Sequence, residues 1–299
     1  MQTDQLRALL AVVDGGTFEA AARRLHVTPS AVSQRIKALE HSLGQVVVRR
    51  GLPCEPTPAG EVLVRLARQQ HLLEQEARAA LEESAAPREL AVAVNADSLA
   101  SWFRPILHEF AGWEGVVLRL HVEDEGHSHE LLRAGTVLGA VTSNPVPVQG
   151  CSVERIGGMR YLPVATPELR DRFTRGRTVD WARMPVLRFN EHDEVQAGVL
   201  ARHGVEREAM PPTHRIPSSE AFAEAVRAGL GWGALPQAQC AEELERGSLV
   251  RLGTRDHVDV PLHWQSWRLR SPLVDRLTDA IRAAAPAQRR TRDSAGPAR

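Results

Sequence analysis

The stretch from Thr17 to Glu40, TFEAAARRLHVTPSAVSQRIKALE, decides how the N-terminal part of this 299-residue chain folds. Thr28 offers a side-chain oxygen that can cap a helix, and Pro29 suits the first helical position, where its missing N–H costs nothing. The apolar positions that recur at the helical period after this start are Val32, Ile36 and Leu39. The pattern predicts a helix with one face packed inward.

The opposite face of the same helix is polar. The hydroxyl, amide and cationic side chains on it are Ser30, Ser33, Gln34, Arg35 and Lys37. Groups of these kinds hydrogen-bond base edges and phosphates. A short connection, His26 to Thr28, joins this helix to a preceding one that carries small residues. We therefore expect a helix-turn-helix that reads double-stranded DNA; the alternative is a helical hairpin within an ordinary core.

Other residues extend the pattern in a fixed order: Ala20-Ala21, Leu25, Thr28 to Ser33, Ile36, Leu39-Glu40, Leu43-Gly44 and Arg49. In order and spacing they resemble the LysR-type transcriptional regulators. The resemblance implies a wing at Val46 to Arg50 and Pro56 to Pro58, and it adds Thr28, Pro29, Arg49 and Arg50 to the expected DNA contacts. The chain departs from the family pattern at Pro29, where members often carry Gln, and at Val47-Val48, where Leu-Phe is usual.

Composition is ordinary for a globular protein, with 43% apolar and 25% charged residues. The 37 basic residues equal the 37 acidic ones, so a nucleic-acid-binding surface over the whole protein is not expected. Residues 1–60 carry seven basic against five acidic residues, a surplus of two. Most of these cations lie in the expected helix-turn-helix and wing, so contact with DNA phosphates should be confined to this region. The affinity for DNA should fall as the salt concentration rises.

The cysteines, Cys54, Cys151 and Cys240, form no C-x-x-C pair, and any disulfide scheme leaves one unpaired. The sequence shows no signal segment and no apolar run long enough to cross a bilayer, so we expect a cytoplasmic protein without membrane contact. His127-x-His129 beside Glu123 and Asp124 is too common a pattern to predict a metal, and no cofactor is predicted.

A long helix is expected from Ala59 to Glu83, followed by a hinge at Ser84 to Arg88 where Pro87 breaks it. Its apolar stripe consists of Val62, Leu66, Leu73, Ala77 and Leu81. The stripe needs a partner, either the chain's own domain or a second copy of itself. The family resemblance favours a homodimer or homotetramer.

From Leu90 onward, short apolar strands alternate with helices, which is typical of α/β domains with largely parallel sheets. Strands are expected at 90–94, 116–122, 137–143, 161–165, 185–189, 213–216 and 233–235, and a helix at 98–110. The family resemblance implies that 249–252 and 261–267 cross back between the lobes and that a helix at 272–284 closes the first lobe. The overall expectation is an α/β protein with an N-terminal winged helix-turn-helix, a linker helix and two lobes of periplasmic-binding-protein type. Its domains would be 1–58, 59–88 and 89–285, with lobe I at 89–157 and about 266–285, lobe II at 158–265, and a disordered tail at 286–299.

Three segments narrow the resemblance: Val94 to Trp102, Val122 to Glu125 and Ser218 to Phe222. They are similar to the ArgP/LysG subgroup, which senses lysine and arginine and controls basic amino-acid export. A basic amino acid needs carboxylates for its cations and N–H or hydroxyl donors for its carboxylate. The residues expected to hold it in a crevice between the lobes are Asn95, Asp97, Ser98, Asp124, Thr142, Asn190, Asp193, Ser219 and Trp232. Sequence does not choose between lysine and arginine.

Some of these residues could instead have purely structural roles. Asn95, Asp97, Ser98 and Ser219 could simply cap helices, at about 1 kcal/mol each, and Trp232 could belong to the core. An enzyme is the main rival class, but the chain shows no G-x-S-x-G, H-E-x-x-H or phosphate-binding glycine loop, and Lys37 is its only lysine. An amino-acid-binding protein is the second rival. The subgroup resemblance implies promoter DNA, a basic amino acid and RNA polymerase as partners, and it implies activation of an exporter gene.

Overall fold

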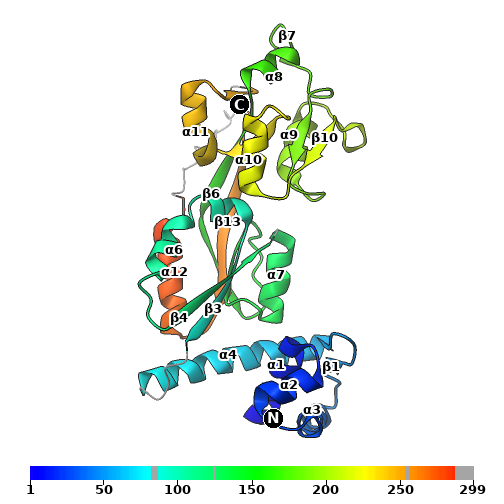
Figure 1. Ribbon diagram of the computed structural model, residues 1–299, viewed down its shortest axis with the longest axis vertical. Helices are drawn as coiled ribbons and strands as arrows, with labels where there is room; N and C mark the ends of the chain where they lie inside the picture. The colour runs from blue at the N-terminus through cyan, green and yellow to red at the C-terminus, as the bar shows by residue number, and fades with distance from the viewer. Residues whose placement is uncertain (82–86, 124, 254–255, 287–299) are drawn as a thin grey trace, which may run out of the picture. The chain divides into compact units, whose positions relative to one another are not determined.

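The computed structural model describes residues 1–81, 87–123, 125–253 and 256–286 (Figure 1). These residues form two compact units. Unit 1 consists of Met1–Val94, His108–Glu154 and Trp264–Ala280, and unit 2 consists of Asn95–Leu107, Arg155–His263 and residues 281–286. The predicted hinge lies mostly, and the predicted tail almost entirely, outside the described residues.

Unit 1 begins with three helices, α1 (Thr3–Gly15), α2 (Phe18–Leu25) and α3 (Pro29–Leu43). The Thr17 hydroxyl accepts the N–H of Ala20 at the start of α2, and Thr28 accepts the N–H of Ala31 at the start of α3. Between the helices, His26 adopts φ 53°, the left-handed conformation that turns the chain sharply. The predicted helix-turn-helix is confirmed, including its cap and its first-position proline.

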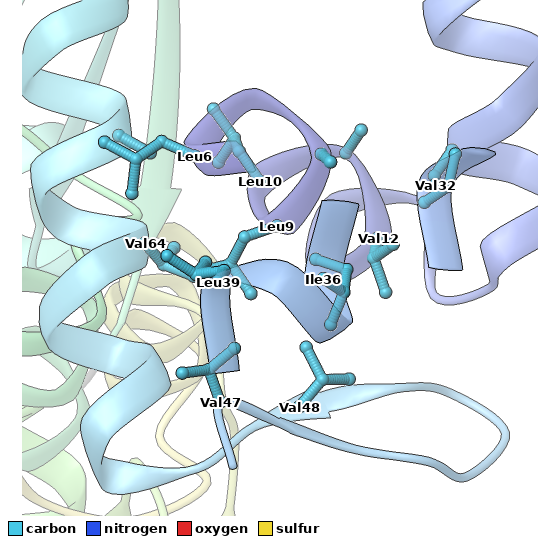
Figure 2. Packing of buried hydrophobic residues seen from close by; sticks show 14 of the residues in the cluster. Leu6, Leu9, Leu10, Val12, Val32, Ile36, Leu39, Val47, Val48 and Val64 are labelled. Atoms are coloured by element: carbon cyan, nitrogen blue, oxygen red, sulfur yellow. The ribbon is translucent and has the colours of Figure 1, made fainter. Parts of the chain in front are cut away.

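The inner face of α3 is buried as its periodicity predicts. Val32, Ile36 and Leu39 are at most 1% exposed, and they pack in one cluster with residues of α1 such as Leu9 and Val12 (Figure 2). Each such buried side chain contributes about 1.5–3 kcal/mol relative to exposure. Because this face is held inward, the polar face of α3 is directed outward.

The wing is a hairpin of β1 (Val48–Arg49) and β2 (Glu55–Pro56), which pair antiparallel. Val47 and Val48 are buried in the same cluster as α3, so the departure from the family's Leu-Phe pair keeps the position apolar (Figure 2). A carboxylate oxygen of Glu40 accepts the N–H of Val47 at 3.0 Å, which ties the wing to α3.

The long helix α4 runs from Pro58 to Ala80. The residues that it buries are Leu63, Val64, Ala67 and Leu72. The predicted stripe lies on another face: Val62, Leu66, Leu73 and Leu81 are 51%, 38%, 40% and 67% exposed. Among the residues that the structure describes, these four side chains are therefore not covered by the chain's own core.

The remainder of unit 1 is built on three parallel strands, β3 (Arg88–Val94), β4 (Val116–Val122) and β5 (Gly139–Thr142). In register, Val92 of β3 faces Leu120 on one side and Gly139 on the other. Helix α7 (Glu125–Ala134) packs against β3 and β5, and α12 (Pro272–Ala284) follows β13. Strands β6 (Cys151–Ala165) and β13 (Val258–Trp267) run through both units.

In unit 2, β11 (Gly233–Pro236) and β12 (Val250–Arg251) pair antiparallel with β6. Strands β9 (Val186–Arg188) and β10 (Thr213–Arg215) are parallel, and β7 (Thr174–Arg175) and β8 (Thr178–Val179) form a hairpin. The helices are α5 (Ala96–Ala100), α8 (Pro167–Arg172), α9 (Glu194–Arg202), α10 (Ser219–Arg227) and α11 (Gln237–Arg246), with a 3₁₀ turn at Arg207–Ala209. Helix α6 (Arg104–Phe110) crosses the boundary of the units.

The expected strands are all present, but two expectations need correction. The single helix predicted at 98–110 is two helices, α5 and α6, because Pro105 suits a new helix start and the N–H of Phe103 turns back to the carbonyl of Ser98. The sheet is less parallel than expected, since β11 and β12 pair antiparallel with β6. In the described part of the chain, no helix is long and apolar enough to span a membrane.

We predict that Gly60→Ala destabilises the N-terminal domain. A Cβ at Gly60 would lie 2.0 Å from the carbonyl oxygen of Val47, so the wing or α4 must shift. The expected loss is about 1–3 kcal/mol in chemical denaturation followed by circular dichroism. The matched control is Gly198→Ala in α9, which meets nothing within 4 Å and should be neutral or stabilising. Equal stability of the two variants would contradict the packing argument.

Candidate functional site

The outward face of α3 presents the groups expected to meet DNA. Ser30, Gln34 and Lys37 are exposed, whereas Ser33 and Arg35 are partly buried. Arg35 lies 3.6 Å from a carboxylate oxygen of Asp4. The exposed hydroxyl, amide and ammonium groups are of the kinds that hydrogen-bond base edges and phosphates.

The other predicted DNA contacts flank this face. The Thr28 hydroxyl is 2.9 Å from that of Ser30, besides capping α3. On the wing, Arg49 lies 3.4 Å from a carboxylate oxygen of Glu55, with both side chains more than half exposed. The Arg50 guanidinium sits 5.2 Å from the centre of the Phe18 ring. An exposed ion pair such as that of Arg49 is worth about 0–1 kcal/mol, and an exposed cation–π contact such as that of Arg50 about 0.5–1 kcal/mol. Both arginines can therefore exchange partners for phosphate at little cost.

A second polar cluster surrounds Asp97, in unit 2. The Ser219 hydroxyl donates to one oxygen of the Asp97 carboxylate at 2.6 Å, and the Tyr161 hydroxyl donates to the other at 2.9 Å. The Nε2 of Gln239 in turn donates to the Ser219 hydroxyl at 3.0 Å. These residues come from α5, β6, α10 and α11, and the Asp97 carboxylate of α5 is bonded directly by β6 and α10.

The chemistry of this cluster suits a cationic ligand. An ionised carboxylate offers about four lone-pair positions. Two hydroxyl donors fix the Asp97 carboxylate in place and leave acceptor capacity on a side chain that is partly exposed. Charge-assisted hydrogen bonds from ammonium or guanidinium groups to such an acceptor are stronger than neutral ones.

Asn95 and Ser98, predicted beside Asp97, have structural contacts. The Asn95 side chain caps α5 by accepting the N–H of Ser98 at 2.7 Å. The Ser98 hydroxyl is buried and lies 3.6 Å from the Met159 sulfur. At α10 the cap is Ser218, not Ser219, because Ser218 accepts the N–H of Ala221. The capping alternative is therefore correct for Asn95 and wrong for Ser219, whose hydroxyl serves Asp97.

Asn190 and Asp193 belong to the turn before α9. The Asp193 carboxylate accepts the backbone N–H groups of Phe189 at 2.8 Å and Val195 at 3.1 Å, and thus caps the helix. Burial raises its pKa, although these N–H groups act in the opposite direction. Asn190 accepts the N–H of His192. Both side chains satisfy their own backbone, so a part in ligand binding stays a prediction.

The remaining predicted contacts are Thr142, Trp232 and Asp124. Thr142, in unit 1, is buried at the end of β5 and accepts the N–H of Asn144. Trp232 is fully buried in unit 2 and packs edge-on against Trp181, with ring centres 5.0 Å apart, so the core interpretation describes it better than a ligand contact. Asp124 lies outside the described residues.

All three cysteines are free and buried. Burial raises the pKa of the Cys151 and Cys240 thiols to about 11. Because the thiolate is the reactive form, these two residues are poorly suited to nucleophilic or redox chemistry at neutral pH. No cluster of potential metal ligands occurs among the residues that the structure describes.

Tyr161 and Gln239 were not among the sequence-predicted residues. Tyr161 is the only tyrosine of the chain and was assigned simply to a strand. Gln239 lies on α11, 142 positions after Asp97 in the sequence, with no recognisable motif around it. The only feature of the sequence that could have drawn attention to Tyr161 is that it is the sole tyrosine. The packing of β6, α10 and α11 places Tyr161 against Asp97, and Gln239 against Ser219.

Comparison with known proteins gives two family matches. Residues 3–61 match the bacterial regulatory helix-turn-helix proteins of the lysR family, and residues 83–286 match the LysR substrate binding domain. The chain is similar to the lysine export transcriptional regulatory protein LysG of Corynebacterium efficiens, at 52% identity over 97% of this chain and 100% of that protein. It is also similar to the regulator LysG of Mycobacterium tuberculosis, at 49% identity over 94% of this chain and 92% of that protein.

Two solved structures share the fold over almost the whole chain. One is full-length LysG of Corynebacterium glutamicum with bound effector Arg, with a TM-score of 0.85 and 46% identity, covering 95% of this chain and 98% of that one. The other is ArgP of Mycobacterium tuberculosis, with a TM-score of 0.87 and 48% identity, covering 95% of this chain and 97% of that one.

Proposed function

Because the chain belongs to the LysR family of bacterial regulators, we propose that this DNA-binding transcriptional regulator responds to lysine or arginine and controls a gene for basic amino-acid export. The family consists of regulators and not of enzymes, and this chain is likewise not an enzyme. The effector class is supported by the arginine named as effector in the Corynebacterium glutamicum structure, and the target by the name of the lysine export regulators.

The observation that carries the effector proposal is the fixed carboxylate of Asp97. Its two oxygens are oriented by the hydroxyls of Ser219 and Tyr161, and the side chain is partly exposed. Because this carboxylate is already held in one orientation, little conformational entropy is lost when a cation binds to it. Lysine offers a compact ammonium and arginine a planar fork, and a carboxylate accepts both.

DNA binding is assigned to the outward face of α3 and to the wing. Ser33 and Gln34 would read base edges, whereas Lys37, Arg49 and Arg50 would contact phosphates. The regulator would act in the cytoplasm, where its DNA lies, and would activate transcription through RNA polymerase. An effector can switch this output only by binding one conformation of the protein better than another.

Self-association is assigned to α4. Its stripe of Val62, Leu66, Leu73 and Leu81 is exposed in the single chain, although each of these side chains is apolar. Covering such a stripe on a second copy of α4 would bury it in the manner of an antiparallel or parallel helix pair. A dimer would also match a palindromic DNA site.

We predict that Ser33→Ala with Gln34→Ala abolishes sequence-specific binding. Each good base contact contributes about 1–3 kcal/mol, so affinity for a duplex selected in vitro should fall at least tenfold in fluorescence anisotropy. The matched control is His41→Ala with Ser42→Ala, in the last turn of α3, which should bind like the wild type. Unchanged binding by the first variant would exclude this face as the reading surface.

We predict that Asp97→Asn abolishes the response to lysine and arginine. At about 100 times its dissociation constant, a ligand stabilises the wild-type native state by about 2.7 kcal/mol, visible as a thermal shift. The variant keeps the size of the side chain but loses its charge, so the shift should disappear. Asp171→Asn, on α8, removes a carboxylate that pairs with Arg170 and serves as the control. A full shift in the Asp97 variant would refute the assignment.

We predict that Leu66→Glu with Leu73→Glu dissociates the assembly into monomers, because two charges cannot be buried unpaired between helices. The mass is measured by light scattering after size-exclusion chromatography. Val146→Glu, at a position 62% exposed and remote from α4, is the control and should keep the wild-type mass. A monomeric wild type, or an associated double variant, would contradict the proposal.

A further inference from the structure

Arg68, on α4, bonds to two different helices of unit 1. Its Nη1 donates to the carbonyl oxygen of Ala134 at 3.0 Å and to the hydroxyl of Thr136 at 3.1 Å, both at the end of α7. Its Nη2 donates to a carboxylate oxygen of Asp14 at 2.5 Å, near the end of α1. One guanidinium therefore joins the last turn of a DNA-binding-domain helix to the last turn of a helix in the α/β domain.

The charges explain why a cation belongs at this position. A helix C-terminus carries partial negative charge on its unpaired carbonyls. Helices α1 and α7 both end at Arg68, and Asp14 adds a full negative charge to the end of α1, which has no basic residue in its last turn. The Asp14 carboxylate also accepts from Arg24 of α2 at 3.3 Å, so the link extends to the helix that precedes α3.

The backbones of α4 and α7 approach closely at the same point. Gly135, directly after α7, has φ +70°, and a Cβ added there would lie 2.9 Å from the Cα of Arg65. About two turns beyond Arg68 on α4, a carboxylate oxygen of Glu76 accepts from the hydroxyl of Ser271 at 2.6 Å, before α12. The contact at Arg68 is thus part of a fitted junction and not an isolated surface ion pair.

Helix α7 also connects the junction at Arg68 to the strand that precedes the Asp97 cluster. Helix α7 packs against β3, and β3 ends at Val94, three residues before Asp97. We propose that Arg68 is the positioning residue through which a change at the Asp97 cluster reaches the DNA-binding domain, by way of β3, α7 and Asp14. This inference rests on the proposed function for its effector, but the junction itself does not.

The geometry requires arginine at this position. Three bonds leave the guanidinium from two nitrogens that point in different directions, toward Asp14 and toward Ala134 with Thr136. A lysine ammonium is a point charge at the end of a flexible stem and lacks this planar fork. Arg68→Lys should therefore keep the charge and lose the link.

The test compares full-length wild type with Arg68→Gln, Arg68→Lys and the control Arg78→Gln, which changes an exposed arginine of the same helix. Hydrogen–deuterium exchange is measured over residues 131–137 and 11–16. Both segments should exchange faster in the two Arg68 variants and unchanged in the control. Faster exchange in 11–16 alone, or in neither segment, would overturn the proposal.

The second measurement is the coupling between effector binding and DNA binding. Affinity for an in-vitro-selected duplex is measured with and without lysine or arginine, and effector affinity is measured separately by calorimetry. In the wild type the effector should change DNA affinity by about 5- to 150-fold, the usual range of allosteric coupling. In the Arg68 variants this factor should fall below about 2, whereas effector affinity stays within about threefold. Asp14→Asn should reproduce the loss, and adding it to Arg68→Gln should cause no further loss.

Full coupling in Arg68→Gln would overturn the proposal. A wild type that binds neither lysine nor arginine would instead contradict the proposed effector, and the exchange comparison would then decide the role of Arg68. The two failures are therefore distinguishable.

Discussion

Burial of the inner face of α3 is the constraint on which the rest of the N-terminal domain depends. Val32, Ile36 and Leu39 belong to one buried cluster with residues of α1, the wing and α4, and each is almost completely excluded from solvent (Figure 2). The rotation of α3 about its axis follows from this packing, since turning the helix would expose these residues and bury charged ones. The direction of Gln34 and Lys37 is thus determined by the buried residues on the opposite face of the helix.

The same packing carries α4 into the α/β part of unit 1. Val64 and Ala67 lie in the core of the DNA-binding domain, whereas Arg68 and Glu76 bond to the ends of α7 and the start of α12. A third face of α4 holds the exposed apolar stripe. Helix α4 therefore has three faces with different roles. One packs in the core of the DNA-binding domain, one forms the polar junction with α7 and α12, and one is an exposed apolar surface suited to a second copy of the chain.

The Asp97 carboxylate differs in its hydrogen-bond partners from the side chains that cap helices. The side-chain oxygens of Asn95 and Asp193 accept backbone N–H groups at helix starts. Helix capping alone is enough to explain these two residues. In the described part of the chain, the Asp97 carboxylate accepts from two side-chain hydroxyls of other elements, and it retains acceptor capacity. A carboxylate brought together by long-range contacts is harder to explain by local helix stability alone.

The sequence by itself determined the helix-turn-helix, its caps, the wing and the succession of strands and helices, because these depend on periodicity and on residues within a few positions of one another. It could not determine that Ser218, and not its neighbour Ser219, caps α10, since either serine suits the position. Nor could it find Tyr161 and Gln239, or the bonds of Arg68 to Ala134 and Asp14. These contacts join residues 20 to 66 positions apart, and their partners are decided by how β6, α4, α10 and α11 pack. Tertiary packing alone specifies such pairs, because no local pattern records which distant side chain will fill the remaining hydrogen-bonding position.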